Sequence, residues 1–150
     1  MTSPHLAFNQ TMTSLTQQSG SPFEVQATEI NGVPYKHFVS APTSLNDLVA
    51  PARDCGNKEF IAYLDERVSF DEFFSCADQL AYQLIHKLKI NKGEHIAIAM
   101  RNYPEWVLAF NAITSIGAVA VAMNALWLSE EMAYALGDSG AKVLIADQQR

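Results

Sequence analysis

The stretch WVLAFNAITSIGAVAVAMNALWLS, from Trp106 to Ser129, has no charged residue in 24 positions. Its length raises the question of a membrane span, because a spanning helix needs about 20 mostly apolar residues. The apolar pattern changes in the middle, however. Large apolar residues recur at helical spacing in the first half, whereas Val119 and Val121 alternate with alanines after Gly117. The stretch is therefore predicted to be a helix followed by a short buried strand.

A membrane-spanning reading fits the other residues of this stretch poorly. Asn111 and Asn124 would both lie in hydrocarbon, where an unpaired polar side chain is costly. One feature favours a span: Arg101 precedes the run and Glu130 follows it, as the positive-inside rule requires. No Lys or Arg occurs before Lys36, so no secretory or transit signal is indicated. We expect a cytoplasmic protein without a transmembrane span, for which peripheral membrane contact stays open.

The segments on either side of this stretch complete an alternating pattern. Strands are predicted at 95–100, 118–123 and 142–146, with helices at 104–117 and 129–138 between them. Such alternation predicts an α/β fold, a parallel sheet with helices on both faces and right-handed crossovers.

Capping and turn signals organise the upstream part of the chain. Ser69 and Glu72 have capping-box spacing. They predict a helix that follows, with one buried face. The residues of this face are Phe73, Ala77, Leu80, Leu84 and Leu88, and Phe74, Ala81 and Ile85 widen it. Short strands are predicted at 60–64 and 67–70 around an Asp65-Glu66 turn. The Asn31-Gly32 pair predicts a type I′ β-hairpin.

Composition excludes several classes of protein. The 150 residues are 49% hydrophobic and 17% charged, which is typical of a globular domain or of part of one. The net charge is −6 and the bases are dispersed, so a nucleic-acid surface is not expected. Cys55 and Cys76 lack metal-ligand spacing, and the four histidines are scattered. We predict two ordinary reduced thiols and no metal site.

The connection after the first buried strand, AMRNYPEW, contains no glycine, so it lacks the dinucleotide-binding fingerprint. A P-loop and a G-x-S-x-G elbow are also absent from the sequence. Ligands of open α/β sheets bind beyond the carboxyl ends of strands. Arg101 and Asn102 lie at such an end and are therefore the candidate ligand-contacting residues. The favoured alternative is a surface Arg and an Asn that caps the helix at Pro104. We assign no catalytic, cofactor-binding or metal-binding residue.

Three blocks in order resemble the N-terminal part of the adenylate-forming enzymes (the AMP-dependent synthetase/ligase superfamily). They are YLDERVSFDEFFSCADQLAYQL, INKGEHIAIAMRNYPEWVLAFNAITSIGAVAVAMN and SEEMAYALGDSGAKVLIAD, within Ser44 to Asp147. The likeness is greatest to acyl-CoA synthetases, the fatty-acid–CoA ligases. Two elements of the family are matched, Ser69-Phe70-Asp71-Glu72-Phe73 and Gly117-Ala118. Ala122 and Ala125 depart from it, because the family usually has prolines there.

The resemblance implies an ATP-dependent carboxylate–CoA ligase that activates a fatty or similar apolar carboxylate through an acyl-adenylate. ATP, Mg²⁺ and CoA are the implied cofactors and partners. The family's phosphate loop and catalytic lysine have no counterpart in the sequence, so we expect a truncated chain that is inactive alone. Its expected domains are 1–22, an N-terminal helix with a frayed end before it, and 23–150, the incomplete beginning of an AMP-binding (adenylation) domain. The alternatives are a small flavodoxin-like binding module and a non-catalytic interaction protein.

Overall fold

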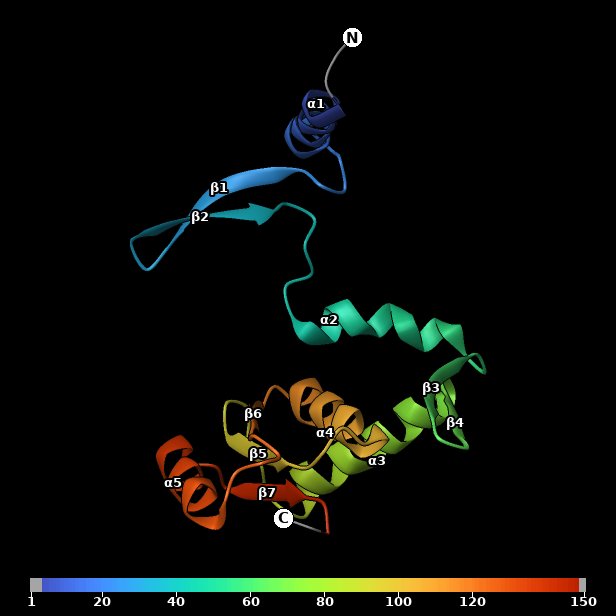
Figure 1. The fold of residues 1–150 in the computed structure, drawn as a ribbon, viewed down its shortest axis with the longest axis vertical. Helices are drawn as coiled ribbons and strands as arrows, with labels where there is room; N and C mark the ends of the chain where they lie inside the picture. Colours follow the sequence, from blue (N-terminus) through green and yellow to red (C-terminus); the bar gives the residue numbers. More distant parts are fainter. Residues whose placement is uncertain (1–3, 149–150) are drawn as a thin grey trace. The chain divides into compact units, whose positions relative to one another are not determined.

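The computed structural model describes residues 4–148 (Figure 1). The chain divides into two compact units, Met1–Thr43 and Ser44–Arg150.

The first unit consists of a helix and a β-hairpin. Helix α1 (Pro4–Gln17) is followed by β1 (Val25–Ile30) and β2 (Val33–Phe38), which pair antiparallel. Asn31 and Gly32 both have positive φ, at 52° and 79°, so the predicted hairpin turn is confirmed. The frayed segment predicted before the helix falls in residues 1–3, outside the described residues.

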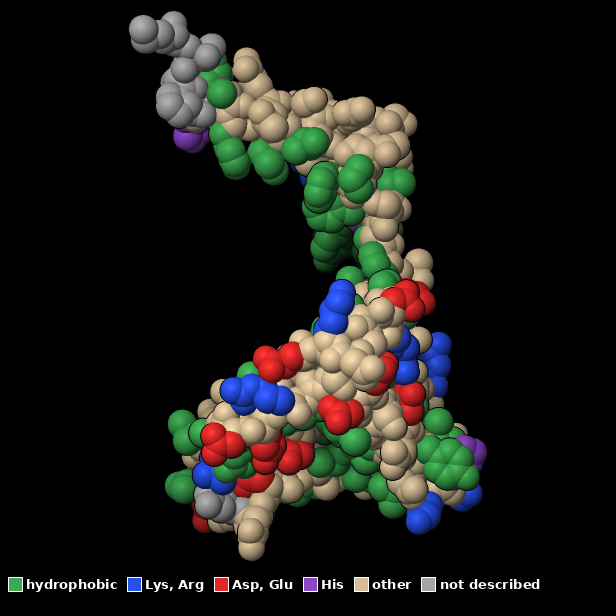
Figure 2. Space-filling model, turned by 90° about the vertical axis from the view of Figure 1, so that its right-hand side faces the viewer, with side chains coloured by type: hydrophobic (Ala, Val, Ile, Leu, Met, Phe, Trp, Pro, Cys, Tyr) green, Lys and Arg blue, Asp and Glu red, His purple; other side chains and the backbone are tan. Residues whose placement is uncertain are grey.

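None of the described side chains in this unit is buried. Phe8, Met12 and Leu15, whose helical spacing predicts helix α1, are all exposed, and Phe8 is 63% accessible. Figure 2 shows hydrophobic side chains gathered along one side of the unit. The helix and hairpin therefore rest on local hydrogen bonds and not on a core of their own. The sequence also predicts that α1 lies on the body of the protein, and this stays a prediction.

The second unit contains the predicted parallel sheet. Its first elements are α2 (Leu45–Val49), the 3₁₀ helix η1 (Ala50–Cys55), β3 (Glu59–Tyr63), β4 (Glu66–Ser69) and α3 (Phe70–His86). Strand β5 (His95–Ala99), α4 (Pro104–Ser115), β6 (Val119–Ala122), α5 (Ser129–Ser139) and β7 (Val143–Ala146) follow. The sheet has the order β6-β5-β7 with both pairings parallel. The predicted α/β architecture is confirmed.

Both faces of the central strand β5 are covered, as the prediction required (Figure 1). Ile96 and Ile98 pack on one face with buried residues of α3 and α4. Ala97 and Ala99 point to the other face, where partly buried side chains of α5 pack. All four side chains have no accessible surface. The alternation of Ile and Ala along β5 therefore places large side chains toward two helices and small ones toward a single close helix.

The uncharged stretch of 24 residues forms a helix and a strand, as predicted, but it is only partly interior. Strand β6 contains no buried residue, and Leu126 and Leu128 are 82% and 73% exposed. Helix α4 ends at Ser115, and Gly117 then adopts a positive φ of 72° before β6 begins. A Cβ at this glycine would lie 3.0 Å from Cγ of Lys92, so the turn is both left-handed and crowded. Within residues 4–148, no helix is long and apolar enough to cross a membrane.

Three local predictions are wrong. The buried stripe of α3 is narrower than expected. Leu88 lies beyond the end of the helix and is 52% exposed, and Ile85, within the helix, is 41% exposed. The turn between β3 and β4 lies at Leu64-Asp65 and not at Asp65-Glu66, with Leu64 at φ 49°.

The third error concerns the start of α5. The sequence predicts that Ser129 is the N-cap of this helix, but Ser129 is its first helical residue. The backbone N–H at the N-cap position, Leu128, donates to Oε2 of Glu131 at 2.8 Å. The glutamate therefore closes this helix end without a side-chain cap from the preceding residue.

The predicted capping box of α3 is confirmed. The Glu72 backbone N–H donates to Ser69 Oγ at 3.3 Å, and the Ser69 backbone N–H donates to Glu72 Oε2 at 2.9 Å. The Ser69 backbone N–H and hydroxyl stabilise the carboxylate and lower the pKa of Glu72. The box fixes where the β3–β4 hairpin ends and the helix begins.

We expect Ser69→Ala to lower the free energy of unfolding by about 0.5–2 kcal/mol, because a backbone N–H of the first turn loses its acceptor. Urea unfolding followed by circular dichroism measures the change. Ser75→Ala, on an exposed position of the same helix, is the control and should leave stability nearly unchanged. Equal losses in both variants would contradict a capping role.

An ion pair ties the amino ends of β5 and β7. The Lys142 ammonium donates to Oε1 of Glu94, whose Oε2 accepts from the backbone N–H of Asn91 at 2.9 Å. The Lys142 contact is the main cause that lowers the pKa of Glu94 from 4.5 to about 2. Because the folded state holds the carboxylate charged, this pair stabilises the protein fully above pH 4.5 and loses its effect as pH falls toward 2.

We therefore expect Glu94→Gln to unfold at lower urea concentration than wild type at pH 7, and the gap to narrow steadily below pH 4.5. Urea midpoints between pH 7 and pH 3 measure it. Glu59→Gln, an exposed acid on β3, is the matched charge control. A gap of constant size across this pH range would contradict the linkage.

Candidate functional site

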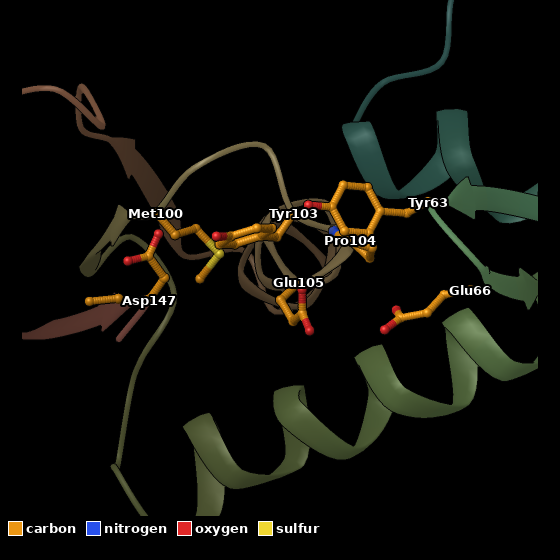
Figure 3. Close-up of a pocket in the computed structure, with 8 residues that line it drawn as sticks. Tyr63, Glu66, Met100, Tyr103, Pro104, Glu105 and Asp147 are labelled. Atoms are coloured by element: carbon orange, nitrogen blue, oxygen red, sulfur yellow. The ribbon is translucent and has the colours of Figure 1, made fainter. Parts of the chain in front are cut away.

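A cavity of about 400 Å³ opens where β5 and β7 end (Figure 3). The connection from β5 runs to β6 on one side, and the next connection returns to β7 on the other side. The carboxyl ends of β5 and β7 therefore flank the point where the winding of the sheet reverses, which is the usual ligand position in open α/β sheets.

Side chains from three parts of the second unit line this cavity (Figure 3). Met100 and Tyr103 come from the connection after β5, and Tyr63 and Glu66 come from the β3–β4 hairpin. The rings of Tyr63 and Tyr103 meet edge to face, with centroids 6.0 Å apart and an interplanar angle of 85°. This contact joins the hairpin to the end of the sheet and forms an aromatic wall.

Arg101 and Asp147 close the end of the sheet. Oδ2 of Asp147 accepts from the backbone N–H of Arg101 at 3.1 Å and from its Nε at 3.2 Å. The Asp147 side chain is only 8% exposed, whereas that of Arg101 is 39% exposed. The guanidinium also lies over the ring of Tyr103, 4.8 Å from its centroid. Arg101 is therefore held in place by a carboxylate and a ring.

The structure places the two residues singled out in the sequence differently. Arg101 lies at the end of the sheet and contacts the cavity residues Tyr103 and Asp147. Asn102 borders a neighbouring hollow of about 240 Å³. It does not cap α4, because Tyr103 occupies the N-cap position and no side chain bonds there.

Sequence reasoning missed Asp147 as a partner of Arg101. The available signal was its position directly after the last strand, because carboxyl ends of parallel strands meet at one edge of a sheet.

The cavity is a poor site for phosphates. Glu66 and Glu105 are exposed at its border, and Arg101 already pairs with Asp147. The start of α4 supplies little compensation, because Pro104 has no backbone N–H and Glu105 puts a carboxylate in the first turn. Residues 4–148 contain no cluster of three or more His, Cys, Asp or Glu that could hold a metal ion. The residues present therefore do not fit ATP with magnesium.

Comparisons with known proteins give a consistent result. The family model described as AMP-binding enzyme matches residues 29–150. A 2-succinylbenzoate–CoA ligase of Bacillus velezensis is 29% identical over 102 residues, covering 68% of this chain and 21% of that protein. The long-chain-fatty-acid–CoA ligase FadD13 of Mycobacterium tuberculosis is 33% identical over 81 residues, covering 54% of this chain and 16% of that protein.

A solved structure agrees with these relatives. The o-succinylbenzoate coenzyme A synthetase of Bacillus subtilis, in complex with ATP and magnesium ion, aligns with a TM-score of 0.63 at 30% identity. The alignment covers 69% of this chain and 28% of that structure's chain. The chain thus spans about a fifth of the length of the Bacillus velezensis ligase and a little over a quarter of the solved chain.

We expect Asp147→Ala to lower the free energy of unfolding by about 1–3 kcal/mol, because the Arg101 backbone N–H and guanidinium lose a buried acceptor. Glu105→Ala, which removes an exposed carboxylate from the same cavity, should change it by about 0.5 kcal/mol or less. Urea unfolding of both, and of a double-mutant cycle with Arg101→Met, measures the coupling. Additive effects in the cycle would show that the two side chains do not interact.

Proposed function

Because the chain belongs to the AMP-binding enzyme family, we propose that it forms part of an ATP-dependent carboxylate–CoA ligase. In the proposed reaction a carboxylate oxygen attacks the α-phosphorus of ATP, and pyrophosphate leaves. The thiol of CoA then attacks the carbonyl of the acyl-adenylate, so the thioester forms and AMP leaves. The single observation that carries this proposal is the family match over residues 29–150. The names of both curated relatives, which are CoA ligases, support it.

The proposed substrate is a fatty acid or a similar carboxylate with a large apolar part. A relative named as a long-chain-fatty-acid–CoA ligase supports the fatty acid. A relative that acts on 2-succinylbenzoate supports an aryl acid instead. Both candidates share an apolar body and a carboxylate, so a panel of acids has to separate them.

We propose that residues 23–150 act as the beginning of the adenylation domain and 1–22 as a helical N-terminal segment. In this proposal the described residues provide a scaffold and hold no catalytic, nucleotide-binding or metal-binding side chain. The acidic border of the cavity at the ends of β5 and β7 supports this division of labour. ATP, magnesium and CoA would be bound by residues of a longer protein. The complex of the Bacillus subtilis enzyme with ATP and magnesium ion supports ATP and magnesium as ligands.

Carboxylate-dependent exchange of labelled pyrophosphate into ATP tests the proposal. We expect no exchange by the 150-residue chain, because in-line attack on the α-phosphorus needs preorganised donors that residues 4–148 do not provide. We expect exchange by the product of the extended reading frame. The panel consists of short, medium and long fatty acids and aryl acids, with omission of the carboxylate as the control.

The exchange assay has three outcomes that would change the proposal. Exchange by the short chain would show that its own residues bind ATP. A folded extended protein that activates none of the acids would exclude the ligase and favour a binding module. Exchange with aryl acids alone would retain the ligase and exclude the fatty substrate.

A further inference from the structure

A further hollow lies on the α5 face of the sheet, away from the cavity at the ends of β5 and β7. Its volume is about 630 Å³. Val121 of β6 and Trp127 of the following loop form one part of its lining, and Tyr134 of α5 forms another. Tyr134 is 74% exposed, although its ring is large and mostly apolar. The hollow is an unfilled apolar site beside the last strand on this side of the sheet.

Strand β6 also presents an open backbone edge. Its neighbour in the sheet is β5 on one side only, within the part of the chain that is described. The backbone N–H groups of Val119 and Met123 donate to Glu94 and Ile98, at 2.9 and 3.0 Å. Because alternate residues of a strand bond to opposite sides, the backbone groups of Ala120 and Ala122 point to the open edge. Small side chains at both positions leave these groups accessible to another strand.

Negative charge surrounds the hollow. Glu130, Glu131 and Asp138 of α5 line it, and no Lys or Arg is among its lining residues. Glu130, Tyr134 and Asp138 recur every four residues, so they lie on one stripe of the helix. Glu130, Glu131 and Asp138 are all exposed. An anionic ligand is therefore repelled here, and a cationic one is attracted.

We propose that the β6 edge and the hollow together bind an extended, basic polypeptide segment, which adds to the sheet as a further strand. The outward backbone groups of Ala120 and Ala122 would pair with this segment. Every second side chain of an added strand faces α5. One apolar side chain would enter the hollow between Trp127 and Tyr134, and its neighbours on the same face, Lys or Arg, would lie beside the carboxylates.

Charge complementarity selects this occupant over others. A second copy of the chain carries a net charge of −6 and would bring the same acidic stripe to the contact. An anionic peptide or lipid headgroup meets the same repulsion. Pairing through the backbone edge supplies affinity that depends little on sequence, whereas the hollow and the carboxylates supply selectivity.

The test uses the whole 150-residue chain and a short peptide with blocked ends, Thr-Lys-Thr-Val-Thr-Lys-Thr, in which Lys and Val share one face. Titration calorimetry measures binding. We expect saturable binding that weakens when salt rises from about 0.05 to about 0.5 M. The same peptide with Glu in place of Lys should not bind. Two further peptides, N-methylated at alternate positions, should differ, because only one set of N–H groups faces β6.

Variants of the chain locate the site. Glu130→Gln and Asp138→Asn should each weaken binding by about two- to five-fold, as expected for an exposed charge pair. Glu105→Gln makes the same charge change on α4, outside the hollow, and should leave binding unchanged. Circular dichroism confirms that each variant is folded.

Four results would overturn the proposal. They are no saturable binding of the Lys peptide, binding of the Glu peptide as tight as that of the Lys peptide, equal binding by both N-methylated peptides, and an effect of Glu105→Gln equal to that of Glu130→Gln. Analytical ultracentrifugation tests the remaining alternative, in which a second copy of the chain occupies the β6 edge. A dimer of the chain that dissociates in Ala122→Pro would assign the edge to a second copy.

Discussion

Strand β5 is buried on both faces and paired on both edges, and the rest of the second unit follows from that constraint. A backbone removed from water must have all its hydrogen bonds made, so β5 needs a parallel neighbour on each side. Its side chains need helices above and below. Right-handed crossovers in opposite directions then place α4 and α5 on opposite faces. The same arrangement brings the carboxyl ends of β5 and β7 together at the candidate cavity.

Side-chain bonds reinforce the two sides of β5 unequally. At one end Arg101 pairs with Asp147, and at the other Glu94 pairs with Lys142. His95 Nδ1 also donates to the carbonyl of Ser139, the last residue of α5, at 2.6 Å. The contacts that join β5 to β6 are backbone hydrogen bonds. The β5–β7 pair is therefore locked at both ends, whereas the outer edge of β6 remains the open side of the sheet.

The electrostatics of the cavity at the ends of β5 and β7 and of the hollow beside β6 limit what the described residues can do in the proposed ligase. Both are bordered by exposed carboxylates, which repel phosphate groups. Arg101, which contacts the cavity residues Tyr103 and Asp147, already forms an ion pair with Asp147. Adenylate chemistry requires several donors directed at one phosphate group, and neither hollow supplies them. This charge pattern supports the proposal that the described residues act as a scaffold of the ligase.

The sequence alone determined the order of the elements, because helix and strand periods and the Ser69–Glu72 and Asn31-Gly32 signals act over a few residues. It also indicated the parallel sheet, since the change of period at Gly117 within a charge-free run predicts a helix followed by a strand. The partner of Arg101 and the position of Asn102 depended on tertiary structure. Arg101 and Asp147 are 46 residues apart, and only the strand order β6-β5-β7 brings them together. The acidic hollow beside β6 likewise combines a strand, a loop and a helix whose relative positions no local pattern encodes.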